Sequence, residues 1–236
     1  MQILILLLYF ERPRLVRNAL ESVHRATTYH ADWKMAFIDD GSSFPGKPIV
    51  CEVLGDQLDK LSFFNTWDDE AIKRERGCVI GDLMNKAIEE SSADLGIMLC
   101  DDDMLYPTYL ADLSRFFTAN PRVLSAYSQV IVYDPLSAEP LSETSQPHPL
   151  NRHNGPICGT CQVDSSQVAW RLECCKVYGA WFASPCNACH DAAFYQELWN
   201  RTGPMYPTGL IGQYKGLHER QLGVLGMDEA WRGRAE

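Results

Sequence analysis

Clusters of carboxylates follow two apolar segments of the chain, and these residues have the clearest capacity for chemistry. Asp39 and Asp40 come directly after residues 34–38, and three aspartates at 101–103 come directly after residues 95–100. If these segments are neighbouring parallel strands, their carboxyl ends meet at one edge, where ligands of open α/β sheets bind. Like charges a few Å apart repel by about 1–4 kcal/mol per pair, so a cation should complete this edge. Oxygen ligands suit a hard divalent ion such as Mn²⁺ or Mg²⁺, which can also hold a diphosphate.

Aromatic and cationic side chains follow a third apolar segment, residues 3–8. Tyr9 and Arg12 come soon after its end, so we expect them at the same edge as the carboxylates. Arg74 or Arg76, close to a glycine at position 77, offers a second cationic contact for a phosphate. Arginines are also common as solvated surface residues, so the sequence leaves both readings open.

The spacing of apolar residues predicts the elements that position these groups. Apolar runs alternate with stripes at helical spacing, a pattern typical of a mostly parallel sheet flanked by helices. The predicted strands are residues 3–8, 34–38, 95–100, 123–133 and 163–171. The predicted helices begin near Pro13, near Ile80, near Pro107 and at Asp191. The sequence therefore predicts the α/β class.

Prolines and glycines mark two segments that we expect to lack regular structure. Residues 134–157 are polar and contain repeated prolines, which predicts a mobile loop. Residues 203–236 contain repeated glycines, which predicts a tail that wraps the surface or becomes ordered with a ligand. Neither segment divides the chain convincingly, so we expect a single domain.

Composition and charge exclude several functional classes. With 31 acidic and 21 basic residues among 236, the chain has a formal charge of −10, so nucleic acid is an unfavourable partner. The apolar run at residues 3–8 is too short for a membrane span and lacks the basic flank of a signal peptide. We therefore expect a cytoplasmic protein with no membrane span.

Nine cysteines without an export signal indicate a reducing compartment, where thiols stay free or hold metal. Four of them form two C-x-x-C pairs, Cys158 with Cys161 and Cys186 with Cys189. This spacing is acceptable for a structural Zn²⁺ held by four thiolates. The alternative is four free thiols, and the sequence does not decide between them.

Four motifs in this order resemble the inverting family 2 glycosyltransferases, which have the GT-A fold. They are Tyr9-Phe10-Glu11-Arg12-Pro13, Phe37-Ile38-Asp39-Asp40-Gly41-Ser42, Asn85-Lys86-Ala87-Ile88, and Asp101-Asp102-Asp103 with Pro107. Weaker matches continue through residues 164–171 and around His190-Asp191, so the resemblance spans roughly residues 3–222. It implies one GT-A-like (Rossmann-like) domain over residues 1–236. Residues 1–120 would bind the nucleotide sugar, and residues 121–236 would form a smaller region with the acceptor site and the catalytic base.

The resemblance also implies roles for the acidic residues. Asp40 resembles the carboxylate that recognises the nucleotide base, with Asp39 as its neighbour. Asp101 and Asp102 resemble the positions of the D-x-D motif that contact ribose and metal, with Asp103 as a further metal ligand. Cys100 stands where many members of the family have the first aspartate of this motif, so the family pattern leaves the principal metal ligand open.

Two later residues resemble the family's catalytic and metal-binding positions. Asp191 resembles the general base, and it shares one helix face with Phe194 and Leu198 at positions i, i+3 and i+7. As an alternative, Asp191 simply caps its helix, because aspartate is a favoured N-cap. His218 resembles a histidine that contacts metal or diphosphate, although a surface histidine is the simpler reading.

The function that the resemblance implies is a metal-assisted glycosyltransferase, hexosyltransferase-like, that moves a sugar from a nucleotide-diphosphate donor to an acceptor hydroxyl, of a saccharide or another molecule. Two alternatives remain. A nucleotidyltransferase on a similar fold usually has glycines after its first strand, and Tyr9-Phe10-Glu11-Arg12 has none. A zinc-stabilised binding module would keep the fold without turnover, and the presence of Asp102 and Asp191 argues against it.

Overall fold

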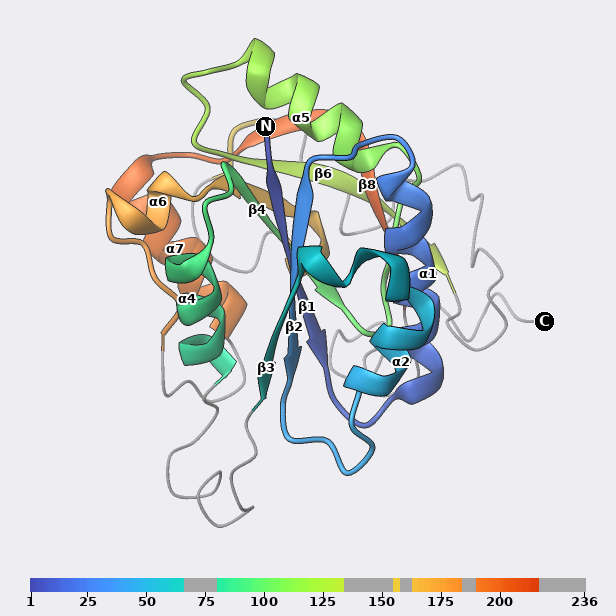
Figure 1. Cartoon of the computed structure of the whole chain (residues 1–236). Helices are drawn as coiled ribbons and strands as arrows, with labels where there is room; N and C mark the ends of the chain where they lie inside the picture. The colour runs from blue at the N-terminus through green and yellow to red at the C-terminus, as the bar shows by residue number, and fades with distance from the viewer. Residues whose placement is uncertain (66–79, 134–154, 158–162, 184–189, 217–236) are drawn as a thin grey trace, which may run out of the picture.

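The computed structural model describes residues 1–65, 80–133, 155–157, 163–183 and 190–216 (Figure 1). The strands are β1 (Ile3–Tyr9), β2 (Trp33–Asp39), β3 (Leu61–Asn65), β4 (Leu95–Cys100), β5 (Met104–Leu105), β6 (Ser125–Tyr133), β7 (Val168–Arg171) and β8 (Tyr206–Gly216). The α-helices are α1 (Pro13–Thr27), α2 (Lys47–Val53), α4 (Ile80–Glu90), α5 (Tyr109–Ala119), α6 (Glu173–Lys176) and α7 (His190–Thr202). No helix in these ranges is long and apolar enough to cross a membrane.

The strands form one sheet in the order β3-β2-β1-β4-β7-β6-β8-β5. Strands β3, β2, β1 and β4 are mutually parallel, whereas β7 runs antiparallel to both of its neighbours, β4 and β6. Strand β8 is parallel to β6, and β5 is antiparallel to β8. The carboxyl ends of β1, β2, β4 and β8 therefore face the same edge, and the chain enters β7 from that edge.

Alternate residues of β1 fill the two halves of the core. Ile3, Ile5 and Leu7 pack in the cluster that contains the apolar faces of α1 and α5. The intervening residues of β1 pack in a second cluster, with α4 and α7. In Figure 1, α4 and α7 lie on one side of the central strands and α1 and α2 on the other. A strand covered on both faces reads as a continuous apolar run, which is the pattern seen in the sequence.

The predicted strands at residues 3–8, 34–38, 95–100 and 123–133 are confirmed as β1, β2, β4 and β6. The predicted strand at 163–171 is shorter, because Asp164 caps a 3-10 turn, Ser165–Gln167, before β7 begins. The predicted helices that begin near Pro13, Ile80, Pro107 and Asp191 are confirmed as α1, α4, α5 and α7.

The prediction of an irregular tail over residues 203–236 is wrong for residues 206–216, which form β8. Its register against β6 shifts between Tyr127 and Gln129 and again between Gln129 and Val130. Gly209 has a positive φ of 73° in this stretch, as a bulge permits. The glycines thus accommodate irregular pairing within a strand. Most of the predicted loop at 134–157 lies outside the described residues, and Ile157 at its end pairs with Met205.

Candidate active site

A pocket of about 320 Å³ lies at the carboxyl edge of the sheet. It brings together residues that are far apart in the sequence. Its lining includes Leu8, Tyr9, Phe10 and Arg12 after or within β1, Asp40 after β2, Cys100 and Asp101 at the end of β4, Asp164 and Ser165 before β7, Asp191 on α7, and Lys215 on β8. Of the predicted site residues, Tyr9, Arg12, Asp40, Asp101 and Asp191 therefore share one pocket. The sheet topology accounts for the first four, because β1, β2 and β4 end at the same edge, and α7 adds Asp191.

The turn after β2 fixes the position of Asp40. The backbone N–H of Asp40 donates to the carbonyl of Tyr9 at 3.0 Å, which links the ends of β2 and β1. The preceding residue, Asp39, is buried and accepts from the backbone N–H groups of Ser42 and Gly46, at 2.9 and 3.0 Å. Asp39 does not line the pocket. The structure thus gives Asp39 a role in shaping the turn, and it presents Asp40 to the pocket.

Arg12 pairs with two carboxylates of the acidic triplet. Its guanidinium lies 2.9 Å from Oδ1 of Asp101 and 2.7 Å from Oδ2 of Asp102. The other oxygen of Asp101 accepts from the backbone N–H of Phe10 at 3.0 Å. Both carboxylates are 2% exposed, whereas the Arg12 side chain is 38% exposed. Arg12 therefore covers buried acidic groups and remains accessible from the pocket.

Lys215 pairs with the third carboxylate of the triplet and with Asp164. Its Nζ lies 3.2 Å from Oδ2 of Asp103 and 3.2 Å from Oδ1 of Asp164, and its side chain is 6% exposed. The backbone N–H of Gly216 donates to the other oxygen of Asp103 at 3.0 Å. Asp164 is fixed independently, because its side chain and that of Gln167 form a reciprocal capping box.

Burial and the neighbouring charges together shift the pKa values of Asp101, Asp164 and Lys215. The pKa of Asp101 rises to about 7, because burial raises it more than Arg12 lowers it. Burial alone would lower the pKa of Lys215, but the charges of Asp103 and Asp164 outweigh burial and raise it well above its usual value. Burial would raise the pKa of Asp164, yet Lys215 and the bonds from Ser166 bring it below its usual value. Lys215 is therefore an ammonium at neutral pH.

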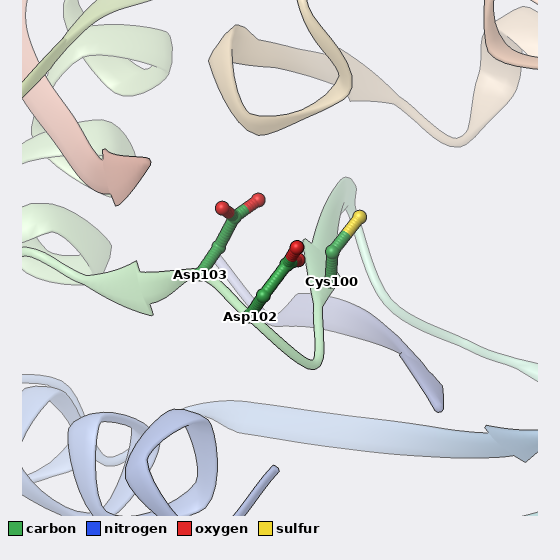
Figure 2. A group of neighbouring side chains, drawn as sticks. All are labelled: Cys100, Asp102 and Asp103. Carbon is green, nitrogen blue, oxygen red and sulfur yellow. The ribbon is translucent and has the colours of Figure 1, made fainter. Parts of the chain in front are cut away.

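Three side chains at the end of β4 lie close enough to share an ion. Ligand atoms of Cys100, Asp102 and Asp103 lie within 4.8 Å of one another, and Figure 2 shows the three side chains projecting to the same side of the chain. The two carboxylates are suitable ligands for Mn²⁺. The thiol is a poorer ligand for Mn²⁺, because soft sulfur favours ions such as Zn²⁺ over harder ones. Without an ion, burial, followed by the charge of Asp103, raises the pKa of Cys100 well above its usual value. Asp102 and Asp103 are already paired with Arg12 and Lys215, so an ion would share them with these cations.

Asp191 stands in the first turn of α7 and lines the pocket. Its Oδ1 accepts from the backbone N–H of Ala192 at 2.8 Å. Phe194 and Leu198 on the same helix are fully buried, as the i, i+3, i+7 spacing predicts. The helix thus anchors in the core and holds the Asp191 carboxylate at the pocket.

Six predicted site residues lie outside the described residues. They are Arg76, His218 and the cysteines Cys158, Cys161, Cys186 and Cys189. The described cysteines, Cys51, Cys100, Cys174 and Cys175, are free thiols.

Lys215 and Asp164 are site residues that were not predicted from the sequence. Lys215 falls in the segment that was predicted to be a tail, and Asp164 precedes a strand that runs opposite to its neighbours. The sequence did indicate a cation at this edge, because the carboxylates expected there would otherwise repel one another. The chain supplies two of the positive charges itself, Arg12 and Lys215.

Comparison with known proteins gives the fold. No family model and no curated protein sequence matches the chain. Among solved structures, it resembles S. aureus TarS in complex with UDP-GlcNAc, with a TM-score of 0.71 and 11% identity over 93% of this chain and 59% of that one. It also resembles the mannosyltransferase PcManGT from Pyrobaculum calidifontis in complex with GDP-Man and Mn²⁺, with a TM-score of 0.67 and 12% identity over 97% of this chain and 60% of that one.

These similarities show that the chain has an α/β fold that occurs in a solved glycosyltransferase. The chain spans about three-fifths of the length of each of these two proteins, and each of them is in complex with a nucleotide sugar.

Proposed function

We propose that the chain is an inverting family 2 glycosyltransferase of the GT-A type, which transfers a sugar from a nucleoside-diphosphate donor to an acceptor hydroxyl. The observation that carries the proposal is the single pocket lined by Asp40, Asp101 and Asp191. A donor has a nucleobase, a ribose and a reacting sugar, and these residues offer a carboxylate for each part. A hexose is the sugar class that the resemblance favours.

In the proposed reaction, Asp191 is the general base. The Asp191 carboxylate takes the proton of the acceptor hydroxyl, and the hydroxyl oxygen forms a bond to the anomeric carbon. The bond from this carbon to the donor phosphate breaks on the opposite face, so the configuration inverts and the nucleoside diphosphate leaves. A positioned base contributes roughly 10²–10⁴-fold to such a step.

The proposed donor contacts follow from the family resemblance, and the residues concerned line one pocket. Asp40 accepts a hydrogen bond from an N–H of the nucleobase, which lies beside Tyr9. Asp101 contacts the ribose. Arg12 is partly exposed at the pocket and offers a cation to the phosphates. Arg76 is proposed as a second phosphate contact on the strength of the sequence alone.

Asp102, Asp103 and His218 would hold a divalent ion, Mn²⁺ or Mg²⁺. When bound, the ion supplies positive charge against the leaving diphosphate. The carboxylates of Asp102 and Asp103 support this proposal by their proximity in the cluster with Cys100. Lys215 adds a fixed positive charge beside them.

Replacement of Asp191 tests the catalytic part of the proposal. Asp191→Asn should leave the affinity for UDP or GDP unchanged while it lowers sugar transfer at least about 100-fold, since the amide cannot accept the proton. The measurement is transfer or hydrolysis of a panel of UDP- and GDP-sugars with Mn²⁺, together with calorimetric nucleotide binding. Glu197→Gln is a matched control, because it removes an exposed carboxylate from the same helix. Equal turnover by wild type and Asp191→Asn would exclude the proposed base.

A second measurement tests the donor side. Asp102→Ala should abolish the part of UDP or GDP binding that depends on Mn²⁺, because the ion loses a carboxylate ligand. Unchanged affinity in calorimetry with and without Mn²⁺ would remove Asp102 from the metal site.

A further inference from the structure

Glu11 stands between two pocket residues in an unusual backbone conformation. Its φ of 56° makes it the only non-glycine residue with positive φ in the described parts of the chain. Side chains of L-residues crowd the backbone in this region, so the conformation persists only where surrounding contacts hold it. Glutamate has no special preference for it, unlike glycine or asparagine.

Contacts from the neighbouring turn hold Glu11 in place. Its backbone N–H donates to Oγ of Ser42 at 3.1 Å. Its carboxylate accepts from both donors of Ser43, from the backbone N–H at 2.5 Å and from the hydroxyl at 2.8 Å. These three bonds, which we name the Glu11 clip, join the loop after β1 to the loop after β2.

The residues on either side of Glu11 both face the pocket. Phe10 lines the pocket with 47% of its surface exposed, and its backbone N–H is bound to Asp101. Arg12 lines the pocket and is bound to Asp101 and Asp102. A change of φ at Glu11 would rotate one of these neighbours relative to the other. The directions of both side chains therefore depend on the conformation that the clip imposes.

We propose that Glu11 is a positioning residue that sets the nucleobase subsite, an inference that rests on the proposed function. The clip joins the loop that carries Phe10 to the loop that carries Asp40, and both residues line one pocket. An aromatic face stacks on any flat base, and a carboxylate accepts from a base N–H. Glu11 does not itself contact the nucleobase. It keeps the two loops in fixed relative positions before the donor binds, so that less conformational entropy is lost on binding.

Two substitutions of Glu11 separate this role from a merely structural one. Glu11→Ala and Glu11→Gly both remove the carboxylate of the clip, but only glycine adopts positive φ without strain. Glu11→Gly should therefore have a higher melting temperature than Glu11→Ala. If Glu11 positions the subsite, both variants should bind UDP and GDP about tenfold more weakly than wild type, and glycine should not restore affinity, because it frees the loop.

The measurements are melting temperature and calorimetric affinity for UDP and GDP with Mn²⁺. Glu21→Ala is the control, because it removes an exposed carboxylate from the helix that follows the loop, and it should change neither quantity. Glu11→Gln keeps the side-chain length and one acceptor, and it should have intermediate affinity even if Glu11→Ala does not fold.

The outcomes distinguish the inference from the function on which it rests. Wild-type affinity in the folded Glu11 variants, or affinity that rises with melting temperature from Ala to Gly, would overturn the positioning role alone. Failure of the wild type to bind either nucleotide would overturn the proposed function and the inference together.

Discussion

Arg12 and Lys215 each neutralise two carboxylates at the edge of the sheet, but in different surroundings. Arg12 pairs with Asp101 and Asp102 and is 38% exposed, whereas Lys215 pairs with Asp103 and Asp164 and is 6% exposed. Arg12 comes from a loop, and Lys215 comes from within a strand.

The comparison shows that the two cations differ in their own exposure. Water and ligands reach Arg12, so a phosphate can approach its guanidinium while Asp101 and Asp102 keep it as their counter-ion. Lys215 is enclosed, and loss of its charge would leave the buried Asp103 and the partly buried Asp164 without this counter-ion.

Replacement of Lys215 should have the largest effect on stability. Lys215→Met should lower the free energy of unfolding by about 3–5 kcal/mol, because it removes the counter-ion of the buried Asp103 and of the partly buried Asp164. Urea denaturation followed by fluorescence measures this change.

A double variant provides the control. Adding Asp103→Asn to Lys215→Met removes one of the unpaired charges and should recover part of the lost stability. A single-variant loss below about 1 kcal/mol, the size of an exposed pair, would mean that Lys215 is not the fixed cation described above.

Replacement of Arg12 should have an intermediate effect. Arg12→Met should lower the free energy of unfolding by about 1–3 kcal/mol, the range for hydrogen bonds to charged groups, because water reaches part of the site. Mn²⁺ should raise the melting temperature of this variant more than that of wild type, since the freed carboxylates of Asp101 and Asp102 attract a divalent ion. Calorimetric melts with and without MnCl₂ measure both effects, and an equal response to Mn²⁺ in both proteins would contradict the prediction.

Replacement of Arg17 should have the smallest effect. Arg17 makes two hydrogen bonds to Glu52, at 2.9 and 2.7 Å, so its geometry is as good as that of Arg12. The Arg17 side chain is about as exposed as that of Arg12, but its partner Glu52 on α2 is 64% exposed, whereas the partners of Arg12 are buried. Arg17→Met should leave the melting temperature unchanged within error, because exposed pairs contribute little. A loss equal to that of Arg12→Met would show that bond geometry, rather than burial, decides the difference.

The sequence predicted three of the four strands in the parallel half of the sheet, β1, β2 and β4, and the edge where their carboxylates meet, but it did not predict β3. Residues 3–8 are apolar at every position because β1 is covered on both faces, and that pattern is visible without a structure. Asp40 and Asp101 could be assigned to one edge because each follows a predicted strand, whereas Asp191 was assigned through the family resemblance. All three line the same pocket.

The antiparallel half was harder to predict. Strand β8 contains Gly209, Gly212 and Gly216, and its pairing with β6 is interrupted, so it lacks the regular alternation of a strand. Asp164 precedes its strand rather than following it, because β7 enters the sheet from the opposite direction. The ion pair between Lys215 and Asp164 depends on contacts between distant segments, which a single sequence does not specify.

The interrupted pairing of β8 has a consequence for the charge of the pocket. Successive side chains of a strand point to opposite faces, so the face on which Lys215 emerges depends on whether the number of residues since the start of the strand is odd or even. The register shifts opposite residues 127–130 set that parity. Loss of a single residue near Gly209 would turn the ammonium toward the other face of the sheet, so a length change remote from the reacting groups would alter the electrostatics that they experience.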